Sequence, residues 1–265
     1  MLNAQRVIVK FKLEEEGEIE FAVWDNPLES PKVINQDVVN FYKRFIRKGS
    51  VIIDIGAHTG DTTVPMALAN GKEGTTIAFD PNPYVFEILS INSKLNTQKT
   101  NIIPYNYAIA VEPGEYFYNS SEATHNNGGI SKDKINKHGK YQLQNKVVAV
   151  NLLDFLNKEK VDLSQLSFIK IDTEGLDYDI LISFKEIIKN YRPIIIAECF
   201  SKLDKIKRDN LYTLFDELDF DLFKLPEKFE TKEDICQIES KEDMRKWKHF
   251  DFYTVPKERV EEIHS

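Results

Sequence analysis

Between Ser50 and Cys199 the chain alternates short, apolar runs with segments of helical periodicity. Apolar residues recur every three or four positions in the helical segments, as in 84–95 and 209–218. The apolar runs are residues 51–55, 75–80, 101–110, 167–172 and 193–199. Strands that are apolar on both faces are typical of a parallel sheet covered by helices on both sides. The pattern therefore predicts a doubly wound, mostly parallel α/β sheet of the Rossmann-like type.

Both ends of the chain add further elements to this predicted sheet. Residues 7–13 and 18–24 are predicted to form a hairpin, and a helix is predicted over 36–46, so residues 1–48 form an N-terminal flank or lid. The main domain is expected over 49–258, and residues 219–225 and 249–256 are predicted to close its sheet as an antiparallel pair.

Residues 113–145 interrupt the alternation because they are polar, rich in Asn and Gly, and weakly periodic. Long irregular segments within compact α/β domains are often substrate or lid loops. We therefore expect such a loop here, with disorder as the alternative.

The composition indicates a folded chain without a polyanionic partner. Of the 265 residues 42% are hydrophobic, and the net charge is −8, so no nucleic acid is expected as a partner. The two cysteines do not resemble a disulfide framework or a pair of metal ligands. No apolar stretch is long enough for a signal peptide or a membrane span, so we expect a cytoplasmic protein. The sequence does not predict an oligomeric state.

The strongest local signal is VIIDIGAHTGDTT over residues 51–63, in which a buried strand leads into a loop with only two glycines. A dinucleotide fingerprint needs three glycines, and Asp61 at the start of the following helix would repel a pyrophosphate. An acidic loop instead suits a ligand that carries an ammonium and a sulfonium group. Asp80 ends the next strand, 20 residues after Gly60, which is the spacing of a carboxylate that accepts both ribose hydroxyls. These features favour S-adenosylmethionine over NAD.

Three of the residues predicted to contact the cofactor have an alternative, structural role. Asp80 is alternatively the N-cap of the next helix, Asp54 a strand-end residue that caps the loop, and Asn106 a turn residue. His58 is expected to contact the ligand through its backbone. The predicted cofactor-binding residues are Asp54, Gly56, His58, Thr59, Gly60, Asp80, Pro81, Asn106, Ala108 and Asp172.

The chain resembles the FkbM family of methyltransferases between about Gly49 and Cys199. The resemblance rests on VIIDIGAHTGDTT, AFDPNPYVFEIL, PYNYAIA and above all FIKIDTEGLDYDIL. The first block occurs in many methyltransferases, whereas Lys170–Gly175 within the last block is more particular to this family. The resemblance implies S-adenosylmethionine as cofactor and O-methylation, often of a sugar, a glycan or a secondary metabolite.

Methyl transfer to an alcohol needs a group that removes the hydroxyl proton. Asp172 and Glu174 follow the fourth strand, and both carboxylates lie on one side if that strand continues. They are predicted to orient the acceptor, to accept its proton or to bind Mg²⁺. Alternatively, Asp172 binds the amino group of the cofactor and Glu174 caps the next helix. Lys170 is expected to be structural and to pair with an acid.

Two residues outside this block are further catalytic candidates. His125 lies in the irregular segment and is a suitable base near neutral pH, with an exposed loop histidine without a role as the alternative. Glu198 ends the fifth strand among apolar residues and is predicted to bind substrate or metal, since an idle buried carboxylate is costly, with a buried structural hydrogen bond as the alternative. A metal site, if present, would draw on Asp172, Glu174 and Glu198.

Three other functions remain as alternatives. The first is N-methylation of a small molecule, since a nitrogen acceptor needs no strong base and the aromatic residues of YNYAIA suit a planar substrate. A non-catalytic subunit that binds S-adenosylmethionine would have lost the loop or the carboxylates, which are both intact. An NAD-dependent sugar oxidoreductase would require the missing glycine.

Overall fold

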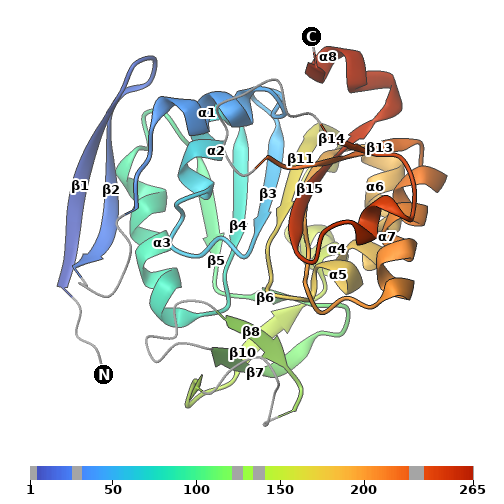
Figure 1. Cartoon of the computed structure of the whole chain (residues 1–265). Coiled ribbons are helices and arrows are strands. Elements are labelled where there is room, and N and C mark those ends of the chain that lie inside the picture. The colour runs from blue at the N-terminus through green and yellow to red at the C-terminus, as the bar shows by residue number, and fades with distance from the viewer. Residues whose placement is uncertain (1–4, 26–31, 121–127, 134–140, 227–235, 265) are drawn as a thin grey trace.

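The computed structural model describes residues 5–25, 32–120, 128–133, 141–226 and 236–264. Its central sheet has eight strands in the order β14-β13-β15-β12-β11-β3-β4-β5 (Figure 1). Five of these strands are parallel, namely β3 (Val51–Ile55), β4 (Thr75–Phe79), β5 (Ile102–Tyr105), β11 (Leu166–Ile171) and β12 (Ile194–Cys199). The predicted doubly wound, mostly parallel α/β sheet is confirmed. Because the strand order reverses between β3 and β11, a ligand site is expected at the carboxyl ends of these strands.

Helices pack on both faces of this sheet, as the apolar strands predicted (Figure 1). One face is covered by α1 (Gln36–Lys43), α2 (Thr63–Asn70), α3 (Pro83–Leu95) and α8 (Val260–His264). The other face is covered by α4 (Leu152–Lys158), α5 (Asp177–Ser183), α6 (Lys185–Tyr191) and α7 (Lys205–Glu217). Short 3₁₀ helices are η1 (Leu163–Gln165), η3 (Asp243–Arg245) and η4 (Lys257–Arg259).

The helical segment between β11 and β12 consists of two helices, α5 and α6, because the chain leaves helical geometry at Phe184. The backbone ψ of Phe184 is 2°, and its ring is buried in the core between the sheet and the helices. A helical sequence pattern does not reveal such a break.

The sheet ends in the antiparallel strands β13 (Phe220–Lys224), β14 (Cys236–Ile238) and β15 (Phe250–Pro256). The pairing of β13 with β15 confirms the predicted closing pair. β15 also pairs antiparallel with β12, and this register sets Glu198 directly opposite Asp251.

The N-terminal hairpin consists of β1 (Gln5–Leu13) and β2 (Gly17–Asp25), as predicted. It forms a separate two-stranded sheet beside α3 (Figure 1). Asn92 of α3 and Asn96 at its C-cap bind the backbone of β2 through their side-chain amides, Asn92 at Ala22 and Asn96 at Glu20. These side-chain amides thereby pair with backbone groups on the free edge of β2, in the way that the backbone of a neighbouring strand would.

A second sheet lies at one end of the central sheet (Figure 1). It contains β6 (Ala108–Ile109), β10 (Val147–Val150), β7 (Gly114–Ser120) and β8 (Gly128–Ser131) in that order, and β9 (Tyr141–Gln142) pairs with β7. The expectation of an irregular segment over 113–145 is therefore wrong for its described residues. Strand pairing with β10, which lies outside the segment, orders β7 despite its weak sequence pattern. None of the helices in the described ranges is long and apolar enough to cross a bilayer.

Candidate active site

The loop after β3 passes very close to the chain that follows β11. Gly56 has a φ of +83°, and a Cβ atom on it would lie 1.8 Å from the carbonyl oxygen of Asp172. The Asp172 amide donates a hydrogen bond of 2.9 Å to the carbonyl of Ile55, which continues the pairing of the two strands. Only glycine fits this position, so the sequence GAHTG allows the two loops to form one side of a pocket.

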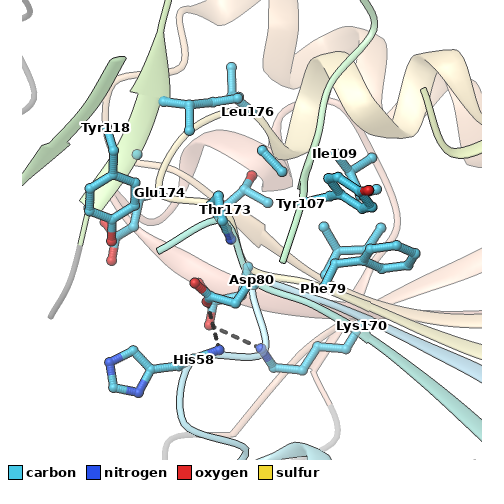
Figure 2. Close-up of a pocket in the computed structure, with 18 of the residues that line it drawn as sticks. His58, Phe79, Asp80, Tyr107, Ile109, Tyr118, Lys170, Thr173, Glu174 and Leu176 are labelled. Carbon is cyan, nitrogen blue, oxygen red and sulfur yellow. Dashed lines mark hydrogen bonds and ion pairs between the residues drawn. The ribbon is translucent and has the colours of Figure 1, made fainter. Parts of the chain in front are cut away.

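Asp80, immediately after β4, lies on the pocket wall and faces the loop (Figure 2). One carboxylate oxygen accepts a hydrogen bond of 2.8 Å from the His58 amide, and the other accepts one of 2.9 Å from the Asn82 amide. Burial raises the pKa of Asp80 to about 6. Asn82, not Asp80, caps α3 through its side chain, so the alternative role of Asp80 as the helix cap is wrong. Each carboxylate oxygen of Asp80 keeps a lone pair for a ligand hydroxyl.

Asp61 lies on the same wall, where its carboxylate has a lysine and a histidine as neighbours. The Lys32 ammonium is 2.7 Å from one carboxylate oxygen, and the Nδ1 of His58 is 3.7 Å from the other. Burial opposes ionisation of Asp61, but His58 and Lys32 outweigh it and hold its pKa well below the usual range. The carboxylate predicted to favour a cationic ligand is thus already paired with Lys32.

Lys170 is a buried cation between two carboxylates. Its ammonium lies 3.1 Å from Asp172 and 3.9 Å from Asp54. Burial lowers the pKa of Lys170, but the charges of Asp172 and Asp54 outweigh this effect and raise it. The expectation that Lys170 pairs with an acid is confirmed, and its side chain also lines the pocket.

The block that follows β11 does not continue as a strand. β11 ends at Ile171, and Glu174 has a φ of +57°, which is unusual for a residue with a side chain. Asp172 and Glu174 are both exposed and both line the pocket. The N-cap of the next helix is Leu176, whose own side chain makes no capping hydrogen bond. The turn places Glu174 against the second sheet, since a Cβ atom on Gly129 of β8 would lie 3.7 Å from the Glu174 Cβ.

The opposite wall of the pocket is largely apolar. Phe79, Tyr107 and Ile109 gather on one side, where the rings of Tyr105 and Tyr107 stack at 6.5 Å (Figure 2). The second sheet contributes Tyr118 and Gly128–Ile130 to the rim. The pocket is therefore acidic on the loop side and aromatic on the side of β5 and β6.

Most of the predicted site residues line the pocket. They are Gly56, His58, Asp80, Pro81, Ala108, Asp172 and Glu174. Asp54, Thr59, Gly60, Asn106 and Glu198 do not line it. His125 lies outside the described residues.

Three of the predicted residues that do not line the pocket support it from behind. Asp54 is fully buried under the loop and accepts a hydrogen bond of 2.6 Å from Thr63, which matches its alternative role as a loop cap. Asn106 donates one of 2.8 Å to the Asp80 carbonyl, so it positions Asp80. Gly60 has a φ of +93° and packs against Leu89.

Several pocket residues were not predicted. Lys32 comes from the N-terminal flank, where no sequence pattern marks a single lysine. Tyr118, Gly128 and Gly129 lie in the segment flagged for its composition, but nothing in that composition selects them.

Glu198 lies beside the pocket, in the neighbouring strand, and has its own partners. Its Oε1 is 2.9 Å from the Nε2 of His249, and its Oε2 is buried without a hydrogen-bond partner. Burial raises the pKa of Glu198 to about 9, and the charges of Asp177 and Asp172 act in the same direction. Among the described residues, the group with metal-ligand spacing is Glu198, His249 and Asp251, which differs from the predicted set of Asp172, Glu174 and Glu198.

Comparison with known proteins identifies a methyltransferase domain. The family model described as the methyltransferase FkbM domain matches residues 54–230, which is more than half of the chain. A search of curated protein sequences finds no match. The matched range contains every residue that lines the pocket except Lys32.

Solved structures of similar fold include three methyltransferases. A methyltransferase FkbM from Methylobacillus flagellatus is 12% identical with a TM-score of 0.48, over 83% of this chain and 53% of that one. An O-methyltransferase from Bacillus cereus in complex with SAH is 12% identical with a TM-score of 0.45, over 85% of this chain and 84% of that one. A precorrin-6y C5,15-methyltransferase from Geobacter metallireducens is 11% identical with a TM-score of 0.42, over 86% of this chain and 93% of that one.

Proposed function

Because the chain belongs to the FkbM methyltransferase family, we propose that it transfers the methyl group of S-adenosylmethionine to a hydroxyl oxygen. The acceptor is a small molecule or glycan, such as a sugar or a secondary metabolite. Both described cysteines, Cys199 and Cys236, are free, which suits a protein that acts in the reducing cytoplasm.

The observation that carries the proposal is the arrangement of Asp80 and Gly56 around one pocket. Asp80 is held by two backbone amides with lone pairs left for the two ribose hydroxyls. Gly56 leaves space where a Cβ atom would clash with Asp172. One polar atom of a loop residue that lines the pocket, the Nε2 of His58, is buried without a hydrogen-bond partner. Such an atom supports a bound polar ligand, since isolated buried polar groups are costly.

The pocket walls suit the other parts of this cofactor. We assign the adenine ring to the side of Tyr107 and Ile109, because planar rings pack well against aromatic and aliphatic side chains. The amino-acid part then lies near Lys32, Asp61 and Asp172. In this arrangement Lys32 binds the cofactor carboxylate, and one of the two aspartates binds its ammonium.

When bound, S-adenosylmethionine would supply a methyl group on a sulfonium sulfur, and the pocket would hold the acceptor oxygen in line with that methyl group and the sulfur. The hydroxyl proton must pass to a base. Asp172 and Glu174 are exposed at the pocket and serve as acceptors for this proton, and His125 stays a further prediction.

Titration calorimetry with S-adenosylmethionine, S-adenosylhomocysteine and NAD tests the cofactor assignment. We expect both adenosyl compounds to bind and NAD to bind at least about tenfold more weakly, because the acidic loop repels a pyrophosphate. Tighter binding of NAD would favour the oxidoreductase alternative. Methyl transfer from labelled cofactor to a panel of sugars and amines would separate oxygen from nitrogen acceptors.

Substitutions at the two exposed carboxylates test the chemistry. Asp172→Asn and Glu174→Gln preserve size, and the variant that loses the base should lose about 10²-fold or more in turnover while it still binds the cofactor. Glu73→Gln, at an exposed turn remote from the pocket, is the matched control. Normal turnover in both variants would remove these carboxylates from the chemistry and leave His125 as the candidate base.

A further inference from the structure

The carboxyl end of β12 presents two carboxylates in direct opposition. Glu198 pairs in register with Asp251 of the antiparallel strand β15, and like charges directly opposite each other destabilise a sheet. His249 lies two residues before Asp251, so its side chain lies on the same side of the chain. One histidine nitrogen and one oxygen from each carboxylate all lie within 4.8 Å of one another.

Glu198 has a buried oxygen that no described group satisfies. The residue is 8% exposed, and its Oε2 has no hydrogen-bond partner, while its Oε1 is 2.9 Å from the His249 Nε2. A distance of about 3 Å is the spacing of adjacent ligands around a metal ion that is bound at about 2.1 Å. The unpartnered oxygen is an open ligand for a cation, and the close approach of the three side chains would let them share one.

We propose that Glu198, His249 and Asp251 bind a divalent transition-metal ion such as Mn²⁺ or Zn²⁺. An imidazole with two carboxylates suits these ions better than it suits Ca²⁺, which prefers oxygen ligands alone. Three protein ligands leave coordination positions open, which is typical of metal sites that bind substrate or water. His249 and Asp251 are exposed, so such a ligand has access.

The site lies next to the carboxylates of the pocket. β11 and β12 are neighbours with Ile171 paired to Ala197, so Asp172 and Glu198 follow at the same level of the sheet. Asp177 also links the two sites, since it accepts hydrogen bonds from the Thr173 hydroxyl at 2.6 Å and from the Glu198 amide at 3.4 Å. If the proposed methyltransferase function holds, the metal binds oxygen atoms of the acceptor beside Asp172. This role rests on the proposed function, whereas metal binding itself does not.

Titration of the full chain with MnCl₂ tests the site after dialysis against a chelator and removal of that chelator. Free Mn²⁺ is counted by electron paramagnetic resonance, and a parallel titration uses ZnCl₂. We expect one ion per chain, and Glu198→Gln, His249→Gln and Asp251→Asn should each weaken binding by about 10²-fold or more, because even groups that only orient a ligand change affinity 10- to 100-fold. Glu261→Gln, an exposed carboxylate on α8, should bind as the wild type does.

Thermal unfolding provides a second measurement. Mn²⁺ should raise the midpoint of the wild type and of Glu261→Gln but not of the three ligand variants, an effect that a purely structural Glu198–His249 pair would not produce. No stoichiometric binding of either ion, or equal binding in wild type and ligand variants, would overturn the site. Calorimetry with S-adenosylmethionine on the same samples separates the two proposals. Ion binding without cofactor binding defeats only the proposed function, and the reverse result defeats only the metal site.

Discussion

At the scale of single residues, Asp80 links the cofactor site to pH. Its pKa is raised to about 6 by burial, so the folded protein holds this proton more tightly than the unfolded chain does. The contribution of Asp80 to the free energy of unfolding is therefore present at low pH and is lost as the pH rises from about 4 through about 6. Ribose hydroxyls bind the ionised carboxylate better, so the affinity for the cofactor should instead increase as the pH rises.

We predict that the affinity for S-adenosylmethionine falls about tenfold between pH 7.5 and pH 5, because about a tenth of Asp80 is ionised at pH 5. Asp80→Asn should remove this pH dependence and weaken binding at pH 7.5 by about 10-fold to 10²-fold, through hydrogen bonds to a charged group worth about 1.5–3 kcal/mol each. Calorimetry at the two pH values measures both effects. His58 also titrates nearby, so His58→Asn, which tolerates the φ of +50°, is the control that should keep the pH dependence.

Lys170 has a stability role that can be measured apart from catalysis. Asp54 is fully buried, its Oδ1 has no hydrogen-bond partner, and the Lys170 ammonium lies 3.9 Å away. Lys170→Met should lower the free energy of unfolding by about 3–5 kcal/mol, because it leaves a buried carboxylate without its cation. In urea unfolding, the double variant Lys170→Met/Asp54→Asn should recover at least about 1 kcal/mol of that loss. Losses that simply add would show that the two charges are not coupled.

At the scale of elements, the approach of the β3 loop to the chain after β11 depends on Gly56. Gly56→Ala should abolish measurable cofactor binding and destabilise the fold, because its Cβ would overlap the Asp172 carbonyl at 1.8 Å. Gly49 provides a matched control, since it has a similar φ of +79° and nothing within 4 Å of an added Cβ. Gly49→Ala should cost only about 1–2 kcal/mol of stability from its backbone conformation and should bind normally. Normal binding by Gly56→Ala would show that the loops can separate without loss of the site.

The elements show which parts of the molecule the sequence determines locally. The apolar runs that became β3, β4, β11 and β12 were predictable because strands buried on both faces need continuous apolar residues. The second sheet was not, since β7 and β8 are held by pairing with each other and with β10 across distant sequence. The run over 101–110 shows the same limit, because it divides between two sheets at Asn106.

Site residues that directly follow the parallel strands were predictable, whereas site residues brought in by pairing with distant segments were not. Gly56, Asp80 and Asp172 follow strands of one sheet, so topology alone brings them to one edge. His249 and Asp251 reach Glu198 through the antiparallel return of β15, and no spacing in the sequence gives that register. Lys32 reaches Asp61 from the segment before α1, 29 residues earlier in the chain.

At the scale of the whole molecule, the N-terminal hairpin is connected to the cofactor loop through α3. The buried Asn92 side chain binds the Ala22 amide at 2.6 Å and the Ala22 carbonyl at 3.1 Å, and it also donates a hydrogen bond of 2.8 Å to the Thr59 carbonyl in the loop. The side chain of Asn96, one turn later, hydrogen-bonds the Glu20 backbone alone among the described residues, at 3.0 and 2.8 Å. The two asparagines therefore hold the same hairpin, but only Asn92 also holds the loop.

This difference gives a prediction about coupling across the molecule. Asn92→Ala and Asn96→Ala should both reduce hydrogen-exchange protection of the β2 amides, since each leaves backbone groups of the hairpin unpaired at about 1–3 kcal/mol per buried group. Only Asn92→Ala should also weaken S-adenosylmethionine binding, because only this variant frees the Thr59 carbonyl between His58 and Gly60. In the wild type the cofactor should in turn increase protection at Ala22, since coupling between two sites acts equally in both directions. Equal cofactor affinity in the two variants would show that the hairpin is an independent addition to the methyltransferase fold.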